Sequence, residues 1–353
     1  MIPEFYTQQA EWQGRIEEII ELVGRVSALE EIAHDPVELR RTNRLMSVHS
    51  STAIEGNQLS LSQVEDVARG DTVLAPPREV LEVENALAAY EALDSFDPWN
   101  VGDFLRAHQL LTQGLIRESG AFRTVDVDIV NADGEVIHSG SRVEKVPRLI
   151  TELLDWGRTS DDHPLIVSSA VHFLLEHIHP FRDGNGRIGR LWQTLILSRW
   201  RPIFAWIPVE TLIREHQAGY YTALQASREP EIDAAAFITF MLDVIEQALV
   251  GYEVRARSIV TNVGVNVGVK IPDAILALLR EDPTLKTTDL AANLGRTKRT
   301  IERHLRTLQQ YGLLNRVGSD KTGHWIVIDS SRAYTATSTG KTDLNNDLTI
   351  FPL

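Results

Sequence analysis

Hydrophobic residues recur every three or four positions along most of this chain, which is the spacing of one face of an α-helix. The stripe is clearest at residues 11–33, where Ile16, Ile19, Val23 and Val26 lie on one side. The same spacing predicts further helices at residues 37–54, 78–93, 101–116 (with Asn100 as its cap), 145–156, 164–178, 188–199, 210–227 and 232–250. The pattern therefore indicates a mainly α-helical protein.

The spacing changes from helical to alternating at residues 125–130, Val-Asp-Val-Asp-Ile-Val. Residues 131–134, Asn-Ala-Asp-Gly, have the composition of a tight turn, and the chain then returns through residues 135–138. Two alternating segments joined by such a turn are typical of a β-hairpin. We therefore expect one hairpin, at residues 125–138, within a helical bundle.

The C-terminal part has the pattern of a small separate unit. Helical spacing at residues 272–280, 288–294 and 297–311 is followed by two short strands, 313–317 and 325–328, around the turn Gly-Ser-Asp-Lys-Thr-Gly. Three helices and a two-stranded wing form a winged helix-turn-helix. We predict five regions: an N-terminal helical region at 1–95, a main helical core at 96–250, a partly helical linker at 251–270, the winged helix at 271–330 and a loose tail at 331–353.

Composition narrows the class of protein. The hydrophobic share of 43% and the charged share of 24% are ordinary for a globular protein. The longest apolar stretch, residues 234–250, contains Asp243 and Glu246, so we expect no membrane span. The chain has no cysteine, which excludes disulfides, thiol catalysis and cysteine-bound zinc. With no basic and apolar leader at the start of the sequence, we expect a cytoplasmic protein.

One segment interrupts the helical pattern with polar residues, His179-Pro-Phe-Arg-Asp-Gly-Asn-Gly-Arg-Ile-Gly-Arg190. Gly184, Asn185 and Gly186 suit a tight turn whose backbone N–H groups start a helix. Such an N-terminus attracts anions, phosphate above all. His179 precedes the turn, and its imidazole suits a general base that acts on a hydroxyl group near neutral pH.

The charged residues of the segment fit the same purpose. Asp183 offers the hard oxygen ligand that Mg²⁺ prefers, and the Asn185 amide can donate to a phosphate oxygen. Arg187 and Arg190 lie three positions apart on one helix face, so both can reach the outer phosphates. Zinc is the competing explanation, because His172, His177 and His179 cluster, but their spacing does not suit one helix face.

This segment resembles the signature of the Fic family at every defining position. The segment Gly120-Ala-Phe-Arg123 and the pair Tyr220-Tyr221 are also similar to family features, and the resemblance covers about residues 40–230. It implies a Fic-type helical bundle with a hairpin flap, and transfer of AMP from ATP, with Mg²⁺, to a Ser, Thr or Tyr hydroxyl of a target protein. The residues it implies are His179 as the base, Asp183 for Mg²⁺, and, for ATP, Gly184, Asn185, Gly186, Arg187, Ile188, Gly189, Arg190, Tyr220 and Tyr221.

Two details bear on that activity. Family members that transfer phosphate tend to carry Lys where this chain has Gly186, so AMP transfer is favoured, with other nucleotides left open. An exposed strand of the hairpin 125–138 could align a target segment with His179 by β-augmentation, or the hairpin could be an ordinary surface feature.

A second motif lies well before the first. Residues 51–56, Ser-Thr-Ala-Ile-Glu-Gly, resemble the inhibitory motif of Fic proteins whose inhibitor is an N-terminal helix, here about residues 37–56. Ser51 and Glu55 are four positions apart on one helix face, just before the helix-stopping Gly56. Glu55 paired with Arg190 would make that arginine unavailable to ATP. Glu55 could instead position water for AMP removal, or be a surface glutamate.

The winged helix allows a second class of function. Residues 285–325 hold eight Lys or Arg against three Asp or Glu, in a chain of net charge −14. Lys298, Arg299, Arg303 and Arg306 crowd its third helix and Lys321 lies on the wing, which suits DNA contact. The unit could equally serve docking or dimerisation in a homo-oligomer. The chain is then either a self-inhibited adenylyltransferase or an ATP-sensing, DNA-binding regulator; the presence of the base His179 favours the enzyme.

Overall fold

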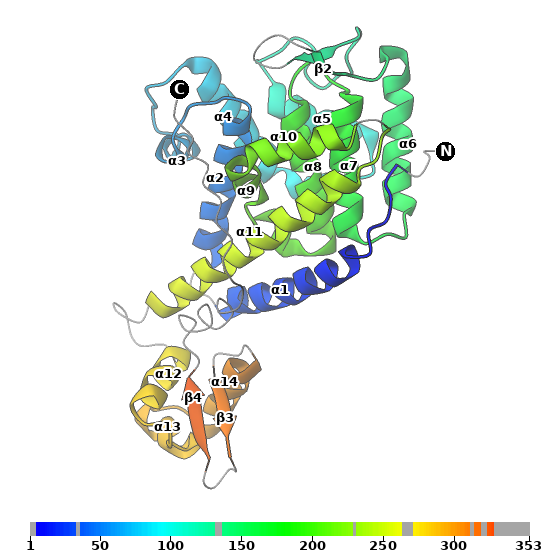
Figure 1. Ribbon diagram of the computed structural model, residues 1–353. Helices are drawn as coiled ribbons and strands as arrows, with labels where there is room; N and C mark the ends of the chain where they lie inside the picture. The colour runs from blue at the N-terminus through cyan, green and yellow to red at the C-terminus, as the bar shows by residue number, and fades with distance from the viewer. Residues whose placement is uncertain are drawn as a thin grey trace, which may run out of the picture. The chain divides into compact units, whose positions relative to one another are not determined.

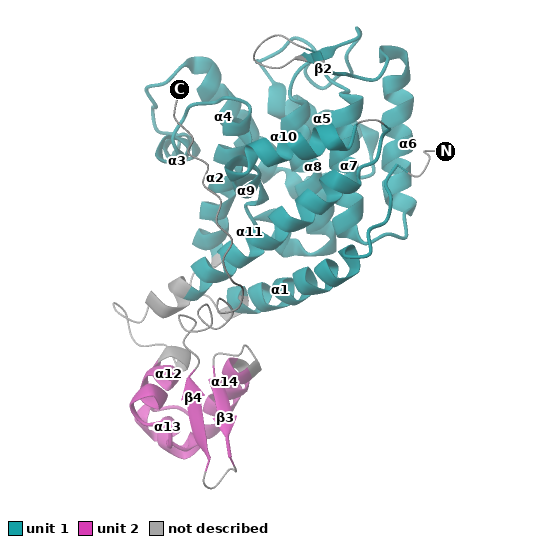
Figure 2. Cartoon of the chain, viewed as in Figure 1, with its two compact units in different colours: residues 1–257 teal, residues 258–353 magenta. Residues whose placement is uncertain are grey.

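The computed structural model describes residues 5–32, 36–130, 136–228, 231–262, 271–310, 314–318 and 323–327. The chain forms two compact units, residues 1–257 and 258–353 (Figure 2). The described residues are mainly helical and contain two small antiparallel sheets, as the hydrophobic pattern predicts. The finer boundaries at 95 and 250 stay predictions.

The first unit is a bundle built around α7 (Pro164–Ile178) and α8 (Asn185–Trp200), whose residues are nearly all buried (Figure 1). Because both helices are enclosed, their few polar side chains have fixed partners inside the protein. The surrounding elements are α1 (Trp12–Ile32), α2 (Pro36–Ile54), α3 (Leu61–Arg69), α4 (Pro77–Glu91), η1 (Leu93–Ser95), α5 (Val101–Thr112), η2 (Val143–Lys145), α6 (Val146–Thr159), η3 (Pro202–Ala205), α9 (Val209–Glu215), α10 (Gln217–Ala226) and α11 (Ala235–Asn262).

The long helix α11 lies beside α1. Arg15 pairs with Asp243, and Trp12 Nε1 donates to Thr239 Oγ1 at 2.9 Å. By length and composition, Ala235–Arg257 is apolar enough to cross a membrane, but half of its most apolar window is buried inside the protein. Phe237 and Met241 are fully buried, which is the environment of a core helix.

The observed helices differ from the predicted ones in three places. Helix α3 was not expected, although Ser60 and Gln63 form a capping box at its start. The single helix expected at 210–227 is two, because the backbone breaks at His216. Helix α5 ends at Thr112 rather than at residue 116, since the chain turns at Gly114 with a φ of 75°.

The expected hairpin is formed by β1 (Asp128–Val130) and β2 (Val136–Ser139), which pair antiparallel with Ile129 opposite His138. The register shifts between Ile129 and Val130, a bulge in the short ladder. The turn predicted at residues 131–134 lies outside the described residues.

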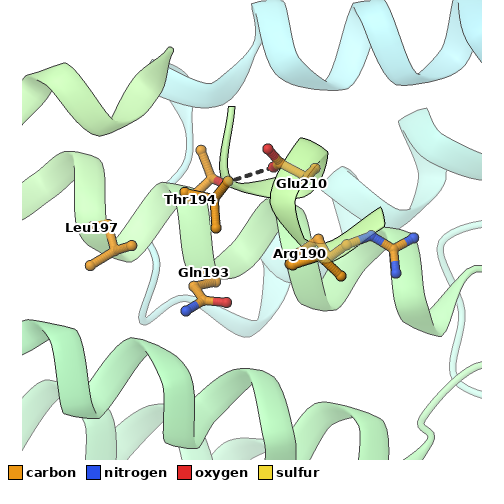
Figure 3. Close-up of a pocket in the computed structure, with 7 residues that line it drawn as sticks. Arg190, Gln193, Thr194, Leu197 and Glu210 are labelled. Atoms are coloured by element: carbon orange, nitrogen blue, oxygen red, sulfur yellow. Dashed lines mark hydrogen bonds between the residues drawn. The ribbon is translucent and has the colours of Figure 1, made fainter. Parts of the chain in front are cut away.

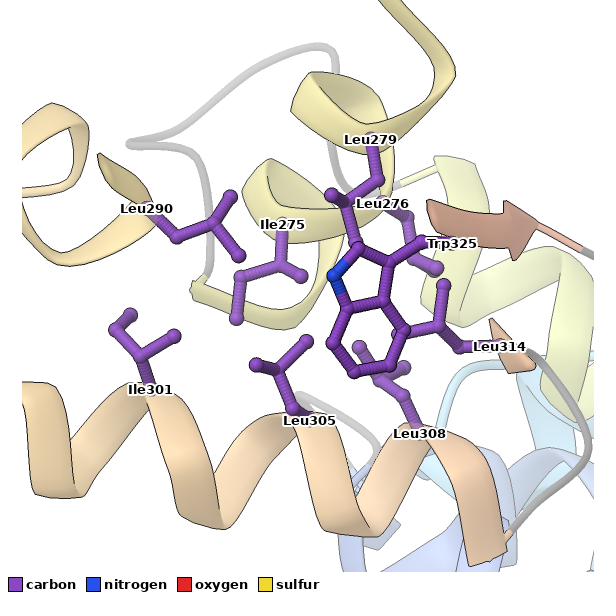
Figure 4. Packing of buried hydrophobic residues seen from close by; sticks show 9 residues of the cluster. All are labelled: Ile275, Leu276, Leu279, Leu290, Ile301, Leu305, Leu308, Leu314 and Trp325. Atoms are coloured by element: carbon purple, nitrogen blue, oxygen red, sulfur yellow. The ribbon is translucent and has the colours of Figure 1, made fainter. Parts of the chain in front are cut away.

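The second unit contains α12 (Ile271–Glu281), α13 (Thr287–Asn293), α14 (Lys298–Gln310), β3 (Leu314–Val317) and β4 (His324–Val327), in the order of a winged helix. Its core is a set of aliphatic side chains around Trp325 (Figure 4). Leu305 and Leu308 of α14 and Leu314 of β3 join helix and wing in this core, so the unit has a hydrophobic centre of its own. The predicted tail at 331–353 lies outside the described residues.

Candidate active site

His179 ends α7 in a left-handed conformation, with φ 54° and ψ 63°. A residue with a side chain rarely adopts this conformation, so the surrounding contacts must hold it there. Arg123 provides them: its Nε donates to His179 O at 2.8 Å, its Nη1 to Val125 O at 2.7 Å, and its Nη2 to Ser141 O. The buried guanidinium thus fixes the His179 backbone and the base of the hairpin together.

The loop after His179 is fixed by its own side chains. The Asn185 amide donates to Phe181 O and accepts from Phe181 N, each at 2.9 Å. The His108 ring stacks on Phe181 with centroids 3.5 Å apart, and His108 Nε2 lies 2.9 Å from Asp183 O. The Nδ1 of His108 accepts from Gly120 N at 3.1 Å, so Nε2 carries the proton and donates to Asp183 O.

Gly184 caps the start of α8 with a φ of 83°, and a Cβ there would lie 2.9 Å from a methyl carbon of Thr112. Conformation and space both require glycine at this position. Its own N–H donates to the Asp183 carboxylate at 2.6 Å, so the N–H groups of Asn185 and Gly186 remain for an anion.

A cavity of about 210 Å³ opens at the N-terminus of α8. It brings together residues from α2, the hairpin, α7, α8 and α10, which the sequence separates widely. The residues that line it are Glu55, Ile129, Glu176, His179, Arg182, Asp183, Gly184, Asn185, Gly186, Arg190, Tyr220 and Tyr221. Sequence reasoning missed Ile129, Glu176 and Arg182 as site residues.

The electrostatics of the cavity keep His179 uncharged at neutral pH. Burial lowers the pKa of His179 to about 4, and the nearby Arg228 acts in the same direction. A neutral imidazole can accept a proton at once, which a general base requires. Burial also raises the pKa of Glu176 to about 7, helped by the charge of Glu55, so this carboxyl group is partly protonated near neutral pH.

Arg190 binds two residues of the Ser51–Gly56 motif. Its Nη2 donates to Glu55 Oε1 at 2.7 Å and to Ser51 O at 3.0 Å, and its Nε donates to Ser51 Oγ at 3.1 Å. The arginine side chain is 1% exposed and that of Glu55 33%. Burial is the largest single influence on the pKa of Arg190 and lowers it, but the charge and hydrogen bond of Glu55, together with Tyr220 and Glu176, make the net shift upward.

Gly186 allows this ion pair to form in the cavity. A Cβ at residue 186 would collide with Glu55 Oε1 and would lie 2.9 Å from Arg190 Nη1. Helix α2 ends at Ile54, and Glu55 lies in the turn that follows, where Gly56 adopts a φ of 96°. The C-terminus of α2 therefore meets the N-terminus of α8 through a carboxylate that fits only over glycine.

Asp183 meets the requirements of a magnesium ligand. Its side chain is 40% exposed, lies at the cavity, and accepts from Arg187 Nη2 at 3.0 Å. The described residues contain no group of three His, Cys, Asp or Glu that could hold a metal ion. An Mg²⁺ at Asp183 would therefore take its other ligands from phosphate and water, which is the usual pattern for this ion.

Four of the predicted nucleotide-binding residues stay predictions, and the structure shows where their side chains lie. The Asn185 amide is bound to Phe181 instead of facing the cavity. The Arg187 guanidinium lies between Asp183 and Glu82, and Arg187 does not line the cavity, so only Arg190 of the pair does. Ile188 is fully buried, and Gly189 packs against His172, so both shape the helix rather than contact the cavity.

The two tyrosines of α10 have different surroundings. Tyr221 is 48% exposed at the cavity, whereas Tyr220 is 1% exposed, and its hydroxyl lies 3.1 Å from His172 Nε2 and 3.4 Å from Glu176 Oε1. His172 Nδ1 lies 2.6 Å from Gln193 Oε1. Both nitrogens of His172 therefore have protein partners, which argues against the zinc trio considered from the sequence.

Comparison with known proteins supports the family. A Fic/DOC family model matches residues 98–197, and a winged helix-turn-helix DNA-binding model matches residues 274–315. The crystal structure of a Fic family protein from Desulfovibrio desulfuricans is 36% identical, with a TM-score of 0.68 over 92% of this chain and 97% of that chain. The chain belongs to the Fic family and carries a C-terminal winged helix-turn-helix.

More distant relatives agree with this placement. Fic-1 from C. elegans shares the fold, with 23% identity and a TM-score of 0.55 over 69% of this chain and 73% of that chain. The protein adenylyltransferase Fic of Aedes aegypti is 26% identical over 242 residues, which are 63% of this chain and 45% of the relative. The chain spans about half the length of the curated relatives it matches.

Proposed function

We propose that this protein transfers AMP from ATP to a hydroxyl group of a protein, itself included. One observation carries the proposal: a neutral histidine, an anion-binding helix N-terminus, an exposed carboxylate and an arginine line a single cavity. Curated relatives named protein adenylyltransferase share this part of the chain. Removal of AMP and transfer of another nucleotide remain the alternatives, because the same groups would serve them.

The chemistry follows from the positions of these groups. The target hydroxyl oxygen forms a bond to the α-phosphorus while the bond to the β-phosphate oxygen breaks, and pyrophosphate leaves. The His179 imidazole takes the hydroxyl proton. The backbone N–H groups of Asn185 and Gly186 hold the α-phosphate, and Arg190 stabilises the charge of the leaving group. Mg²⁺ bound at Asp183 would neutralise phosphate charge.

The same proposal assigns an inhibitory role to Glu55. While Arg190 donates to Glu55 and Ser51, it is not available for the outer phosphates of ATP. Phosphate oxygens can replace the Glu55 carboxylate, since both are anionic acceptors that suit a guanidinium. ATP binding in the productive position therefore competes with Glu55.

The position of the label decides between AMP and phosphoryl transfer. We expect the Glu55→Gly protein to incorporate radioactivity from ATP labelled at the α-phosphate and none from ATP labelled at the γ-phosphate. The Glu55→Gly, His179→Ala double variant is the control and should incorporate neither. Label from the γ-phosphate alone would show a phosphotransferase instead.

We propose that the hairpin binds the target segment. Ile129 of β1 lines the cavity, so a strand added beside the hairpin would reach His179. Val125 and Val136 are 47% and 57% exposed, which leaves apolar side chains available for a partner. Val136→Asp should lower transfer to another protein more than self-modification.

The winged unit supports a second role, DNA binding. Arg299, Arg303 and Arg306 of α14 line a shallow surface cavity of about 390 Å³ together with Thr297 and Thr300. This arrangement suits phosphate contacts beside a recognition helix. A mobility shift by the full chain that weakens with salt, and weakens further in Arg303→Glu, would support this role. Lys321 lies outside the described residues, and the cytoplasmic location and oligomeric state stay predictions.

A further inference from the structure

A buried carboxyl group on α9, Glu210, receives hydroxyl groups from three other helices. Its Oε2 accepts from Ser47 Oγ of α2 at 2.7 Å. Its Oε1 accepts from Tyr90 OH of α4 at 2.6 Å and from Thr194 Oγ1 of α8 at 3.1 Å. Glu210 is 1% exposed, so it has little access to water as a substitute partner. Figure 3 shows its bond to Thr194 in a pocket that Arg190 also lines.

The same carboxyl group is connected to the inhibitory motif through Tyr90. Burial and the charge of Glu210 hold the pKa of Tyr90 well above its usual value, so the phenol keeps its proton and donates it to Glu210. Ser51 acts on the same phenol in the opposite sense and lowers its pKa. Ser51 in turn accepts from Arg190 Nε. Hydrogen bonds thus join Arg190 to Ser51 and Tyr90 to Glu210, with Ser51 and Tyr90 acting on each other between the two bonds.

Because of the residue spacing along α2, these hydrogen bonds depend on the position of the helix along its axis. Ser47 and Ser51 are four residues apart and therefore lie on one face of α2, and Glu55 follows in the turn after Ile54. Ser47 bonds to Glu210, and both Ser51 and Glu55 bond to Arg190. A shift of α2 by one turn, about 5.4 Å, would break all of these contacts together.

We propose that Glu210 is a positioning residue that anchors α2 and thereby holds Glu55 in the nucleotide cavity. This role rests on the proposed function. Hydrogen bonds to a carboxylate are strong, and hydroxyl groups left without it inside the protein would be unsatisfied. Glu210 does not line the nucleotide cavity, so we expect its replacement to leave the residues that would hold ATP in place. Because Thr194 also binds it, the inhibitory and catalytic helices share one acceptor.

Hydrogen exchange of the α2 backbone tests the anchor without relying on activity. In Glu210→Gln and in Ser47→Ala we expect the amides of α2 to exchange at least about fivefold faster than in the wild-type chain, because a hydrogen bond to a charged group is lost. Thr194→Val removes the third hydroxyl, which comes from α8 and not from α2, and should change this exchange less. If the amides of α2 exchange at the wild-type rate in both Glu210→Gln and Ser47→Ala, the proposal that Glu210 anchors α2 is wrong.

Transfer of labelled α-phosphate then tests its effect on inhibition. We expect Glu210→Gln and Ser47→Ala to raise incorporation by about fivefold while Glu55 is present, and to change it little in a Glu55→Gly chain. Reduced incorporation with Glu55 present, or an equal rise in both backgrounds, would contradict a role through α2. If Glu55→Gly itself fails to raise incorporation, the proposed inhibitory role of Glu55 fails, and the exchange result still shows whether Glu210 anchors α2.

Discussion

The catalytic loop at residues 179–185 and the C-terminal end of α2 meet at one cavity but are held in different ways. The loop is fixed by Arg123, which donates to four backbone carbonyls, by the His108 ring, and by the Asn185 amide. Glu55 is held in the cavity by its contact with Arg190, through a side chain that is one-third exposed.

The two kinds of contact differ in whether a bound nucleotide can replace them. Backbone carbonyls are acceptors that a phosphate ligand cannot replace, so nucleotide binding should leave the loop in place. The Glu55 carboxylate is an anion bound to a guanidinium, and a phosphate can take the same place. Under the proposed function, the geometry of the loop stays fixed, while ATP and Glu55 compete for Arg190.

The largest effect is expected at His179. His179→Ala should lower AMP transfer by at least about 10²-fold, because it removes the general base. His179→Asn is the sharper variant, since Asn tolerates the left-handed backbone at this position. His177→Gln is the matched control, because His177 does not line the cavity. The transfer rates are measured in the Glu55→Gly background. If the His179 variants stay within about twofold of the Glu55→Gly parent, His179 is not the general base.

Replacing Arg123 tests whether its hydrogen bonds hold the loop at residues 179–185 in place. Arg123→Gln loses most of the contacts to His179, Val125 and Ser141, so the imidazole should shift and transfer should fall by roughly tenfold to 10²-fold. The exposed Arg142 lies nearby, and Arg142→Gln should leave the rate unchanged. An Arg123→Gln protein that is fully active would show that the loop needs no external support.

Acid should destabilise the catalytic region, because its histidines are buried uncharged. Burial lowers the pKa of His108 to about 4 and that of His172 to about 3. In the unfolded chain histidine titrates near 6.5, so the unfolded state binds more protons and the free energy of unfolding falls as the pH drops from about 6.5 toward 4. At pH 5 each such histidine should cost about 2 kcal/mol relative to pH 7.

Calorimetry at the two pH values checks this expectation. The melting temperature of the wild-type chain should fall between pH 7 and pH 5. His108→Gln should melt lower at pH 7 but lose less on acidification. Glu176 acts in the opposite sense, since its pKa is raised to about 7. A melting temperature independent of pH in this range would contradict the buried, neutral histidines.

Sequence patterns predicted most of the fold because the amphipathic stripes are strong. The helix at 164–178 begins and ends where the pattern places it, and Asn100 caps α5 as expected. Helix α3 was missed although its capping box, Ser60 with Gln63, is readable in the sequence. The break at His216 carries no Gly or Pro, so only tertiary packing explains it.

Less of the site could be predicted from the sequence, because the direction of a side chain depends on neighbours far along the chain. Arg187 and Arg190 lie on one helix face by their spacing in the sequence. The structure separates their partners: Arg187 lies between Glu82 and Asp183. Arg190 binds Glu55 and Ser51. Asn185 looked like a phosphate donor, but its amide closes the loop on Phe181. Glu176 and Arg182 enter the cavity only through the packing of helix and loop.

The competition for Arg190 is tested most directly by transfer of labelled α-phosphate from ATP in wild-type and Glu55→Gly chains, with Glu55→Gln as a variant of unchanged size. We expect incorporation to rise by about tenfold or more in Glu55→Gly, since a buried arginine is released from its carboxylate, and by less in Glu55→Gln. Equal incorporation in the wild-type and Glu55→Gly proteins would contradict the claim that Glu55 withholds Arg190 from the nucleotide.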